Sequence, residues 1–572
     1  MRILVFGCLA PIAVFGSFDL SVTPSQPSPA SVGEIVAFTA NAPGDGVWYR
    51  FRARRAGEEF RTILDYGPDR TLEWTASESE GAYEIEVSAR NLQTGDTAVA
   101  ALPYLISTRV TANTPVVSGT LHPLVFLYSA PGCAAGGAMR VEFRSPEGTV
   151  QSTPAKPCTP GRSMNFYLAG MRAQTEYAAR QVVMSENKSQ LGEEIRFKTL
   201  EAPEGLLEMT VLQAPPAASA GILFSSPLAA PTLASDLQGN LVWFYPRELT
   251  FSTRAGQGGR FFGIIQAPGL DQSGQRVREF DLVGMTLRET NAARVNEQLI
   301  ELGRRPVSGF HHEAFGLPDG RMLVLASSEQ MMADVQGEGS VNVLSDTILV
   351  LDVNLQVVWV WDGFDHMDVR RVATLNETCG RGACPPLYLT QDANDWLHGN
   401  SVQLTPDGNL IFSMRHQDWL IKIDFNNGTG SGNVIWRLGK DGDFTYAGDD
   451  EFPWFSHQHD ARFLDDSTII VFDNGNYHRT VNPEANSRGQ VIAIDEAGRA
   501  ASLILNIDLG GYSFALGSAQ KLSSGNYHFE LGWLPDGSSL SVEYDGAGNL
   551  VYALRAALPR YRTFRMPTMY EP

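Results

Sequence analysis

The sequence predicts an all-β protein, with one or two sandwich domains of the immunoglobulin or fibronectin III type followed by a six-bladed β-propeller. Before residue 203, short runs alternate apolar and polar residues between turns rich in Gly, Pro, Ser and Asp, as half-buried strands do. After residue 203, a pattern of strand, aspartate, turn and strand recurs six times, which is typical of repeated hairpins. A large single sandwich or a β-helix is the alternative that this repeat leaves open.

The N-terminal part divides into two predicted sandwiches, over residues 18–112 and 113–202. The stretch Tyr83–Ala89 alternates strictly and is typical of a late strand in an immunoglobulin-like domain. In the second unit, the residues around Tyr177 resemble the tyrosine corner of a fibronectin III domain, where the hydroxyl bonds back to the preceding loop.

The predicted propeller covers residues 203–572. Its repeated hairpins turn at six aspartates about 50 to 70 residues apart, a spacing that suits four-stranded blades; they are Asp236, Asp281, Asp352, Asp424, Asp495 and Asp545. Because the first strand of each blade lines a central channel, residues at the starts of these strands can converge although they are far apart in sequence.

Composition excludes some classes of function. The chain has 572 residues, and its 64 acidic and 44 basic residues give a net charge of −20. No basic run is present, so nucleic acid is not an expected partner. Beyond the N-terminus, no stretch approaches the roughly 18 apolar residues of a membrane span.

The N-terminus predicts export. Met1 and Arg2 precede an apolar run from Ile3 to Phe15, which is typical of a secretory signal over residues 1–17, although an N-terminal strand or a misassigned start is the alternative. The expected location is therefore periplasmic or secreted. Gly7-Cys8 weakly resembles a lipoprotein cleavage site, which leaves a lipid anchor open.

Four further cysteines form two local pairs, Cys133 with Cys158 and Cys379 with Cys384. In an exported protein, an even number of cysteines indicates disulfides. The spacing of Cys379 and Cys384 would close a tight loop and does not match a zinc knuckle.

Histidines are concentrated in the C-terminal half, where nine of the ten lie between His311 and His528. Three segments place them directly before apolar strands: His311-His312, His398 and His457-Gln458-His459. A single histidine at a strand end is usually structural, but matched positions in a repeat predict that imidazoles meet at one site. Imidazole can transfer protons, attack as a nucleophile or bind a metal near neutral pH.

An arginine is expected beside this site. The hairpin that starts at His398 would bring Arg415 back next to it, and a guanidinium is a planar donor for sulfate, phosphate or carboxylate. Pairing of Arg415 with Asp418 or Asp424 is the alternative. His457 and His459 share a strand face and could bind a metal, but no third ligand is marked, so we predict no metal and no cofactor.

Five strings resemble the bacterial arylsulfate sulfotransferases, in the same order and over about residues 205 to 570: Leu397–Val402, Ser413–Gln417, Ile435–Phe444, Gln458–Ala461 and Val471–Asn476. The resemblance implies a six-bladed propeller, usually periplasmic, that moves a sulfuryl group from a phenolic sulfate ester to another phenol without a nucleotide sulfate donor. It also implies one N-terminal β-domain, from which two apparent sandwiches depart.

The same resemblance implies roles for the site residues. His459 would be the nucleophile that is transiently sulfated, while His398 and Arg415 would hold the sulfuryl oxygens with help from Asn400. One histidine of the His311-His312 pair would complete the cluster as an acid, a base or an anion ligand. Alignment with Gln458-His459 favours His312 and alignment with His398-Gly399 favours His311, so both stay open.

The resemblance further implies a disulfide between Cys379 and Cys384 near the site and a ping-pong mechanism. Small phenols and aryl sulfate esters are then the expected partners, and a homodimer is left open. An aryl sulfate hydrolase and a non-catalytic propeller that binds glycans or proteins are the alternatives, and clustered His and Arg favour an enzyme. Four aromatic residues near the motifs could hold a phenyl ring or belong to the core: Trp396, Trp454, Phe455 and Tyr477.

Overall fold

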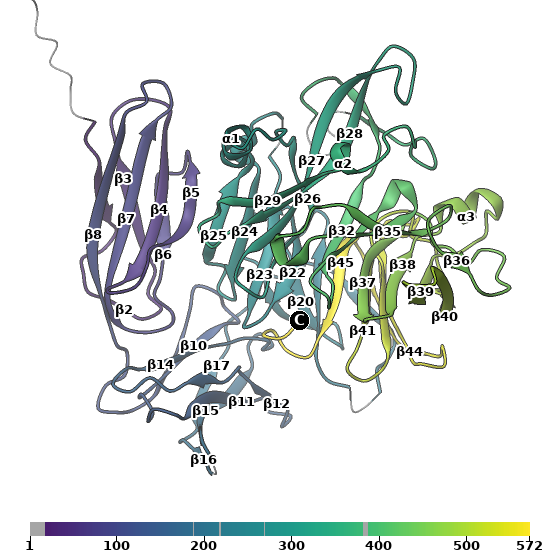
Figure 1. Ribbon diagram of the computed structural model, residues 1–572. Helices are drawn as coiled ribbons and strands as arrows, with labels where there is room; N and C mark the ends of the chain where they lie inside the picture. Colours follow the sequence, from purple (N-terminus) through teal and green to yellow (C-terminus); the bar gives the residue numbers. More distant parts are fainter. Residues whose placement is uncertain (1–17, 187, 217–218, 268, 381–386) are drawn as a thin grey trace, which may run out of the picture.

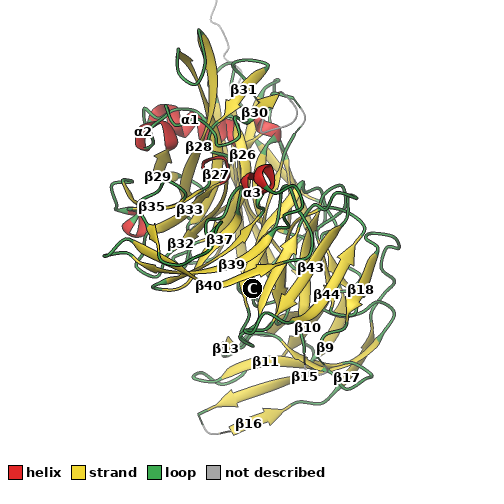
Figure 2. Ribbon diagram, turned by 90° about the vertical axis from the view of Figure 1, so that its right-hand side faces the viewer, coloured by secondary structure: helices red, strands yellow, loops and turns green. Residues whose placement is uncertain are grey.

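The computed structural model describes residues 18–572 apart from 187, 217–218, 268 and 381–386 (Figure 1). The predicted signal peptide, with Cys8, lies outside the described residues. Strands make up nearly all the regular structure, and the helices are few and short (Figure 2), which confirms the all-β prediction. Within the described ranges, none of the helices has the length and apolar run needed to cross a bilayer.

The first N-terminal unit is a sandwich of two sheets. One sheet contains β1 (Ser21–Pro24), β3 (Val36–Asn41) and β6 (Thr71–Trp74), and the other contains β2 (Ala30–Ser31), β8 (Thr97–Ser107), β7 (Gly81–Asn91), β4 (Val47–Arg55) and β5 (Arg61–Gly67). Alternate residues of these strands point inward, so that Phe38, Phe51 and Ile85 are fully buried between the sheets.

The second unit also has two sheets and lies below the C-terminal sheets in Figures 1 and 2. One sheet contains β9 (Val116–Gly119), β10 (Phe126–Ala130) and β14 (Met164–Leu168), and the other contains β11 (Ala138–Arg144), β12 (Val150–Ser152), β13 (Lys156–Pro157), β15 (Glu176–Ser185), β16 (Lys188–Leu191) and β17 (Ile195–Lys198). The hydroxyl of Tyr177 accepts a hydrogen bond from the Arg172 backbone N–H at 3.0 Å, as the predicted tyrosine corner requires. The predicted disulfide between Cys133 and Cys158 is present.

In the rest of the described chain, six antiparallel units of four strands can be followed. The first contains β45 (Arg560–Met566), β19 (Ile222–Pro227), β20 (Leu233–Asp236) and β21 (Leu241–Phe244); the second, β22 (Phe251–Gly256), β23 (Arg260–Ile265), β24 (Arg276–Asp281) and β25 (Thr286–Asn291); the third, β26 (Gly309–Gly316), β27 (Met322–Ala333), β28 (Ser340–Leu351) and β29 (Val357–Asp362).

The fourth sheet contains β32 (Gly399–Leu404), β33 (Leu410–Met414), β34 (Trp419–Ile423) and β35 (Val434–Gly439); the fifth, β37 (His459–Asp465), β38 (Thr468–Asp473), β39 (Arg488–Asp495) and β40 (Ala500–Asp508); the sixth, β41 (Ser518–Lys521), β42 (Tyr527–Leu531), β43 (Ser539–Tyr544) and β44 (Leu550–Ala556). Short strands extend three of these sheets: β18 (Met209–Gln213) the sixth, β30 (Thr378–Gly380) and β31 (Asp392–Asp395) the third, and β36 (Thr445–Tyr446) the fifth. The connecting helices are α1 (Ala292–Glu301), α2 (Gly363–His366), α3 (Asn476–Val481), η1 (Gln272–Gly274), η2 (Arg415–Gln417) and η3 (Asn426–Gly428).

Each of the six aspartates singled out in the repeat lies at the turn between the last two strands of one sheet. The side chain of Asp352 illustrates why, because its carboxylate accepts the backbone N–H groups of Asn354 and Gln356 and so fixes the turn. The first strands of consecutive sheets contact one another from β22 through β26, β32, β37 and β41 to β45. β45 pairs with β19, so the C-terminal strand completes the first sheet. We interpret the six sheets as the blades of the predicted propeller.

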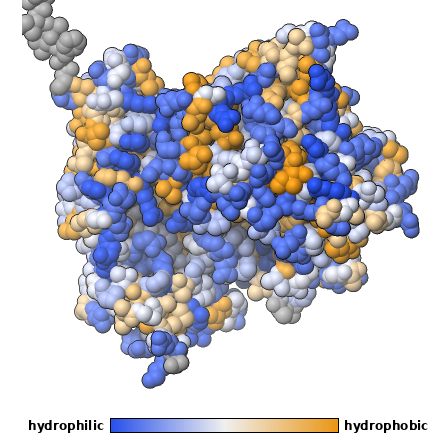
Figure 3. Space-filling model, in the orientation of Figure 1, coloured by the Kyte–Doolittle hydropathy of each residue, from blue (hydrophilic) through white to orange (hydrophobic). Residues whose placement is uncertain are grey.

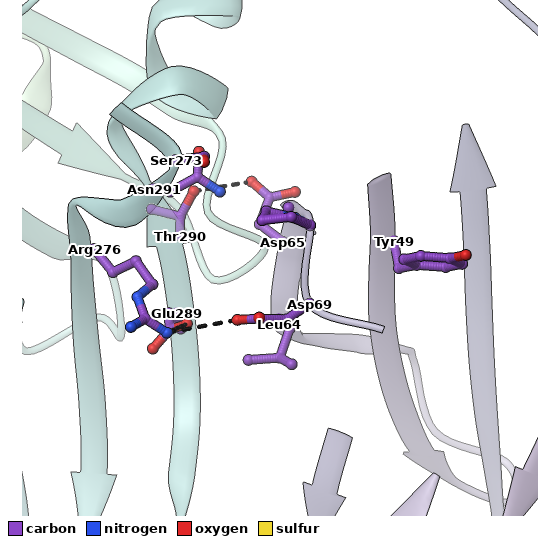
Figure 4. Close-up of a pocket in the computed structure, with 11 residues that line it drawn as sticks. Tyr49, Leu64, Asp65, Asp69, Ser273, Arg276, Glu289, Thr290 and Asn291 are labelled. Carbon is purple, nitrogen blue, oxygen red and sulfur yellow. Dashed lines mark hydrogen bonds and ion pairs between the residues drawn. The ribbon is translucent and has the colours of Figure 1, made fainter. Parts of the chain in front are cut away.

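The first sandwich is joined to the second of these sheets. β5 pairs in parallel with β25, with Leu64 opposite Glu289, so one sheet runs through both units. Figure 4 shows the small cavity at this junction, where Arg276 pairs with Asp69 at 3.5 Å and Thr290 donates to Asp65 at 3.2 Å. Within the described part of the chain, none of the predicted site residues lines this cavity. On the face shown in Figure 3, hydrophilic surface surrounds scattered apolar patches.

Candidate active site

The structure brings the three histidine segments together. The ring centroids of His312 and His398 lie 5.0 Å apart, those of His398 and His416 4.4 Å, and those of His416 and His457 5.6 Å. His459 lies close enough to His398 and Arg415 for both to lower its pKa. Segments in β26, directly before β32, in η2 and at the start of β37 therefore meet at one place, although about 150 residues of chain separate the first from the last.

The backbone is strained where it delivers these imidazoles. His312 and His398 adopt φ values of 53° and 49°, in the left-handed region that non-glycine residues rarely use. The pairing of β26 slips between Phe310 and Ala314, and that of β32 slips between Gly399 and Ser401. A bulge of this kind re-aims a side chain, and strain of roughly 1–3 kcal/mol per residue tends to be kept at functional sites.

His459 is the first residue of β37 and is 2% exposed. Its Nδ1 lies 2.6 Å from the Oδ1 of Asn474. The amide nitrogen of Asn474 donates to the carbonyls of Ser513 and Leu516, which fixes the orientation of the amide. Oδ1 can therefore only accept, so the proton of His459 is on Nδ1 and its Nε2 carries a lone pair.

The same surroundings keep His459 neutral. Burial, followed by the positive charge of Arg415, holds the pKa of His459 well below its usual range, and the hydrogen bond to Asn474 opposes this only in part. The imidazole is thus unprotonated near neutral pH and has a nucleophilic nitrogen.

His398, like His459, presents its Nδ1 to the side-chain oxygen of a neighbouring residue, but in His398 that oxygen belongs to a carboxylate. Its Nδ1 lies 2.6 Å from the Oδ2 of Asp395, the last residue of β31. A carboxylate supports both the Nδ1–H tautomer and the imidazolium form. His398 can therefore accept or donate a proton through Nε2.

The structure distinguishes His312 from His311. His311 is 3% exposed, and its Nε2 lies 3.0 Å from the Oδ1 of Asp346 on β28. The Nδ1 atoms of the two histidines lie 2.8 Å apart, and the ring of His312 is the one that contacts His398. Burial and the neighbouring imidazoles hold the pKa of His312 well below its usual range. The ring of His312 therefore lies in the cluster, and the ring of His311 lies between His312 and Asp346.

Arg415 returns to His398, as the hairpin predicted. Its backbone N–H donates to the His398 carbonyl at 3.3 Å, and its guanidinium donates to His416 Nε2 at 2.5 Å and to the Phe514 carbonyl at 3.1 Å. The alternative partners are engaged elsewhere, because Asp418 accepts from His457 and Asp424 accepts from Ser431. Burial lowers the pKa of Arg415, but an arginine stays charged.

Asn400 is fully buried on β32. Its Nδ2 donates to the Gln458 carbonyl at 2.6 Å, which ties the His398 strand to the segment that ends in His459. Its Oδ1 has no hydrogen-bond partner in the described protein. Asn400 therefore offers one N–H and one carbonyl oxygen for further contacts.

His416 and His457 lie on the side of the cluster that holds carboxylates. His416 Nδ1 donates to the Asp395 carbonyl at 2.7 Å. Burial alone would lower the pKa of His457, but hydrogen bonds to Asp418 and Glu377 outweigh burial and raise it. His457 is therefore a buried imidazolium held between two carboxylates.

Two groups in the described part of the chain are compact enough to hold a metal: Glu377, His416 and His457, and Asp395, His398 and His416. Both ring nitrogens of His416 and of His457 already have partners. A metal bound through His416 Nε2 would also lie against the Arg415 guanidinium. This donor set does not suit a metal ion.

Sequence reasoning missed residues that now adjoin the cluster. Asn474 stands in one of the quoted strings, but nothing in it marks an acceptor for His459. Tyr561 and Arg562 come from the C-terminal strand β45, and the Tyr561 hydroxyl donates to the His312 carbonyl at 2.7 Å. Two predicted aromatic candidates, Trp396 and Phe455, are 1% exposed and belong to hydrophobic cores, so neither can hold a phenyl ring.

Only one cysteine of the second predicted disulfide lies within the described residues. Cys379 on β30 is disulfide-bonded, and its predicted partner Cys384 lies outside the described residues. Glu377, two residues before Cys379, contacts the Nε2 of His457, so this loop adjoins the histidine cluster.

Comparison with known proteins gives one informative match. The family model "Arylsulfotransferase (ASST)" matches residues 201–547, and no curated protein matches the chain. Similar solved structures include a putative 6-phosphogluconolactonase from Bacteroides fragilis, at 10% identity over 91% of this chain and 99% of that one, with a TM-score of 0.28. A two-domain fibronectin type III segment of chicken tenascin matches at 13% identity over 32% and 98% of the two chains, with a TM-score of 0.14.

At such scores, these structural likenesses carry no argument about fold or activity. The family model is different, because it matches more than half of the chain and covers every histidine segment of the cluster. The chain therefore belongs to the arylsulfotransferase family and is an arylsulfate sulfotransferase.

Proposed function

We propose that this enzyme transfers a sulfuryl group from a phenolic sulfate ester to an acceptor phenol in two steps, through a sulfated His459 and without a nucleotide sulfate donor. The hydrogen bond from His459 Nδ1 to Asn474 carries the proposal, because it leaves Nε2 unprotonated in a buried, neutral ring. An activated nucleophile of this kind divides one difficult transfer into two easier ones.

In the first step, the Nε2 lone pair of His459 attacks the sulfur of the donor. The bond from sulfur to the aryl oxygen breaks, and the aryl oxide leaves with the bonding electrons. His398 in its imidazolium form, supported by Asp395, gives a proton to this oxygen, and the donor phenol departs. The new nitrogen–sulfur bond leaves His459 with its Nδ1–H on Asn474, so the sulfated ring carries a positive charge.

In the second step, the acceptor phenol gives its proton to the neutral His398 while its oxygen attacks sulfur. The nitrogen–sulfur bond breaks, and its electrons return to His459. The cationic character of the sulfated ring favours this step, because His459 then leaves as a neutral imidazole. His398 ends as an imidazolium, so protons balance over the cycle and the kinetics are ping-pong.

Fixed donors would hold the sulfuryl oxygens. Arg415, whose backbone N–H donates to the His398 carbonyl, would supply a charged guanidinium, and the ring of His312 lies 5.0 Å from that of His398 and would complete the cluster. Asn400 would assist through its remaining N–H. We assign His311 to a supporting position behind His312, since it is buried against Asp346.

The test is phenol release from an aryl sulfate ester, with and without an acceptor phenol, for the wild type and for His459→Asn. The proposal expects release that depends on the acceptor and disappears in the variant. Brief treatment with donor alone should add the mass of one sulfuryl group to the wild type, on the peptide that contains His459. Release that ignores the acceptor would indicate a hydrolase, and no release from either folded protein would favour the binding-module alternative.

We also propose that the enzyme is exported, with residues 1–17 as a signal peptide. The disulfides at Cys133–Cys158 and Cys379 support an oxidising compartment. N-terminal sequencing of protein recovered from the periplasm or the medium tests this, and an intact Met1 on active protein in the cytoplasm would contradict it.

A further inference from the structure

Beside the histidine cluster, four buried side chains and the partly exposed Arg462 form a linear chain of alternating charge. Arg462 pairs with Asp460 at 2.9 Å, Asp460 with Arg254 at 2.6 Å, Arg254 with Glu313 at 2.8 Å, and Glu313 with Arg562 at 3.0 Å. The residues come from the first strands β22, β26, β37 and β45. Three arginines face two carboxylates, so the chain has one uncompensated positive charge.

The Arg562 end of this chain reaches the site. Its Nη2 donates to the Asn400 carbonyl at 2.5 Å and its Nη1 donates to the Thr253 carbonyl at 3.1 Å. Its neighbour Tyr561 donates to the His312 carbonyl. The strand β45 therefore holds the backbone of both β26 and β32 where they deliver their site residues.

The charge at this end has little access to water. The Arg562 side chain is 1% exposed, and its Nε has no hydrogen-bond partner in the described protein. A guanidinium does not lose its proton in such surroundings. At low effective dielectric, its charge acts over several ångströms, and it contributes to lowering the pKa of His312 and of His459.

We propose that Arg562 is a positioning residue of the transferase site, which fixes the Asn400 carbonyl and adds a buried positive charge that attracts the sulfate monoanion. This inference rests on the proposed function. The residue lies beyond the match to the family model, which ends at residue 547. An aryl sulfate carries one negative charge, and the five-residue chain carries one excess positive charge.

The groups that face His459 determine in which direction the pH dependence of activity would change. They are Arg415, His398, His312, Arg562 and the amide of Asn474. Burial comes first and Arg415 next among the causes that lower the pKa of His459, and Arg562 also lowers it. Only the neutral ring attacks, so activity is lost as pH falls through this pKa. Without Arg562 the pKa rises, and the acid limb of the pH–rate profile moves to higher pH.

The experiment compares Arg562→Gln with a matched control, Arg560→Gln. Arg560 lies on the same strand, is fully buried and pairs with Glu530 at 2.8 Å, and its other contacts are to serines away from the cluster. Each variant leaves a buried glutamate with one arginine fewer, so both lower the melting temperature. Only Arg562→Gln should raise the KM for an aryl sulfate donor, by about tenfold, and move the acid limb up by about one pH unit, with the KM for the neutral acceptor unchanged.

Arg562→Lys provides a second measurement, which stays informative if Arg562→Gln does not fold. Lysine keeps the charge but cannot reach two carbonyls and Glu313 together, so the acid limb should stay in place while kcat falls several-fold. Equal pH profiles and donor KM values for the glutamine variants at Arg562 and Arg560 would overturn the inference, as would wild-type kcat in Arg562→Lys. If His459→Asn keeps its activity, the nucleophile is wrong instead, so the two failures are distinguishable.

Discussion

His457 and His459 lie two residues apart in one segment, and both are buried, yet their surroundings give them opposite charge states. His457 is held between Asp418 and Glu377, which raise its pKa, whereas His459 faces an amide and arginines, and its pKa falls. We call these two parts of the cluster the carboxylate side (Glu377, Asp418 and His457) and the arginine side (His459, Asn474, Arg415 and Arg562). The partner atom, not the residue type, therefore decides the charge state of each imidazole.

The largest expected effect separates the two sides directly. His459→Asn removes the nucleophile and should lower acceptor-dependent sulfuryl transfer by about 10³-fold or more, since the nitrogen that forms the bond to sulfur is gone. Initial rates of phenol release measure this, with circular dichroism as the check of folding. His457→Asn is the matched variant, and it should lower stability more than it lowers the rate per folded molecule. Equal loss of rate in two folded variants would contradict the assignment.

A second substitution would give His459 a carboxylate partner, as His457 has. Asn474→Asp places a carboxylate 2.6 Å from Nδ1, which favours the imidazolium and raises the pKa of His459. Near neutral pH, kcat/KM should fall by about 10²-fold and should recover as pH rises through the new pKa.

The pH–rate profile checks this, because a purely structural effect lowers the rate equally at every pH. Asn474 also holds the Ser513 and Leu516 carbonyls, so some uniform loss is expected in addition. A profile whose acid limb does not move would contradict the role of Asn474.

The sequence predicted those features that depend on local pattern. The six aspartate turns, the Tyr177 corner and the Cys133–Cys158 pair each involve short stretches whose geometry is set by a few neighbouring residues. The histidine segments were visible for the same reason, because they precede strands at matched points of a repeat.

What the sequence could not show depends on contacts between distant strands. Arg562 reaches Asn400 from a strand about 160 residues further along the chain. The choice between His311 and His312 depends on a bulge that turns one ring toward His398, and a bulge leaves no mark in an alternating pattern. Trp396 and Phe455 were ambiguous because an aromatic residue in a core and one in a site look alike in sequence.

A third prediction concerns stability on the carboxylate side. His457 has a raised pKa in the folded state, so its contribution to stability is fully present below the pKa of about 6.5 of an unfolded histidine and is lost as pH rises through the folded pKa. The free energy of unfolding should therefore fall with rising pH above about 6.5. In Glu377→Gln this decrease should be smaller, by on the order of 1 kcal/mol, because one of the two supporting carboxylates is gone.

Denaturant unfolding at about pH 6 and about pH 8 measures the difference, with Arg560→Gln as a control that leaves His457 untouched. The same pH dependence in the wild type and in Glu377→Gln would show that His457 is not the titrating group.

The smallest expected effect tests whether the arginine side depends on backbone position as well as on charge. Tyr561→Phe removes only the hydroxyl that donates to the His312 carbonyl at 2.7 Å, and it leaves the Arg562 contacts in place. A lost hydrogen bond of about 0.5–1.5 kcal/mol should loosen the strained backbone at His312 and lower kcat about threefold. Because no charge changes, the acid limb of the pH–rate profile should stay where it is in the wild type. Steady-state kinetics across pH separate the two quantities, and a moved acid limb would mean that Tyr561 acts on His459 through its charge environment rather than on His312 through the backbone.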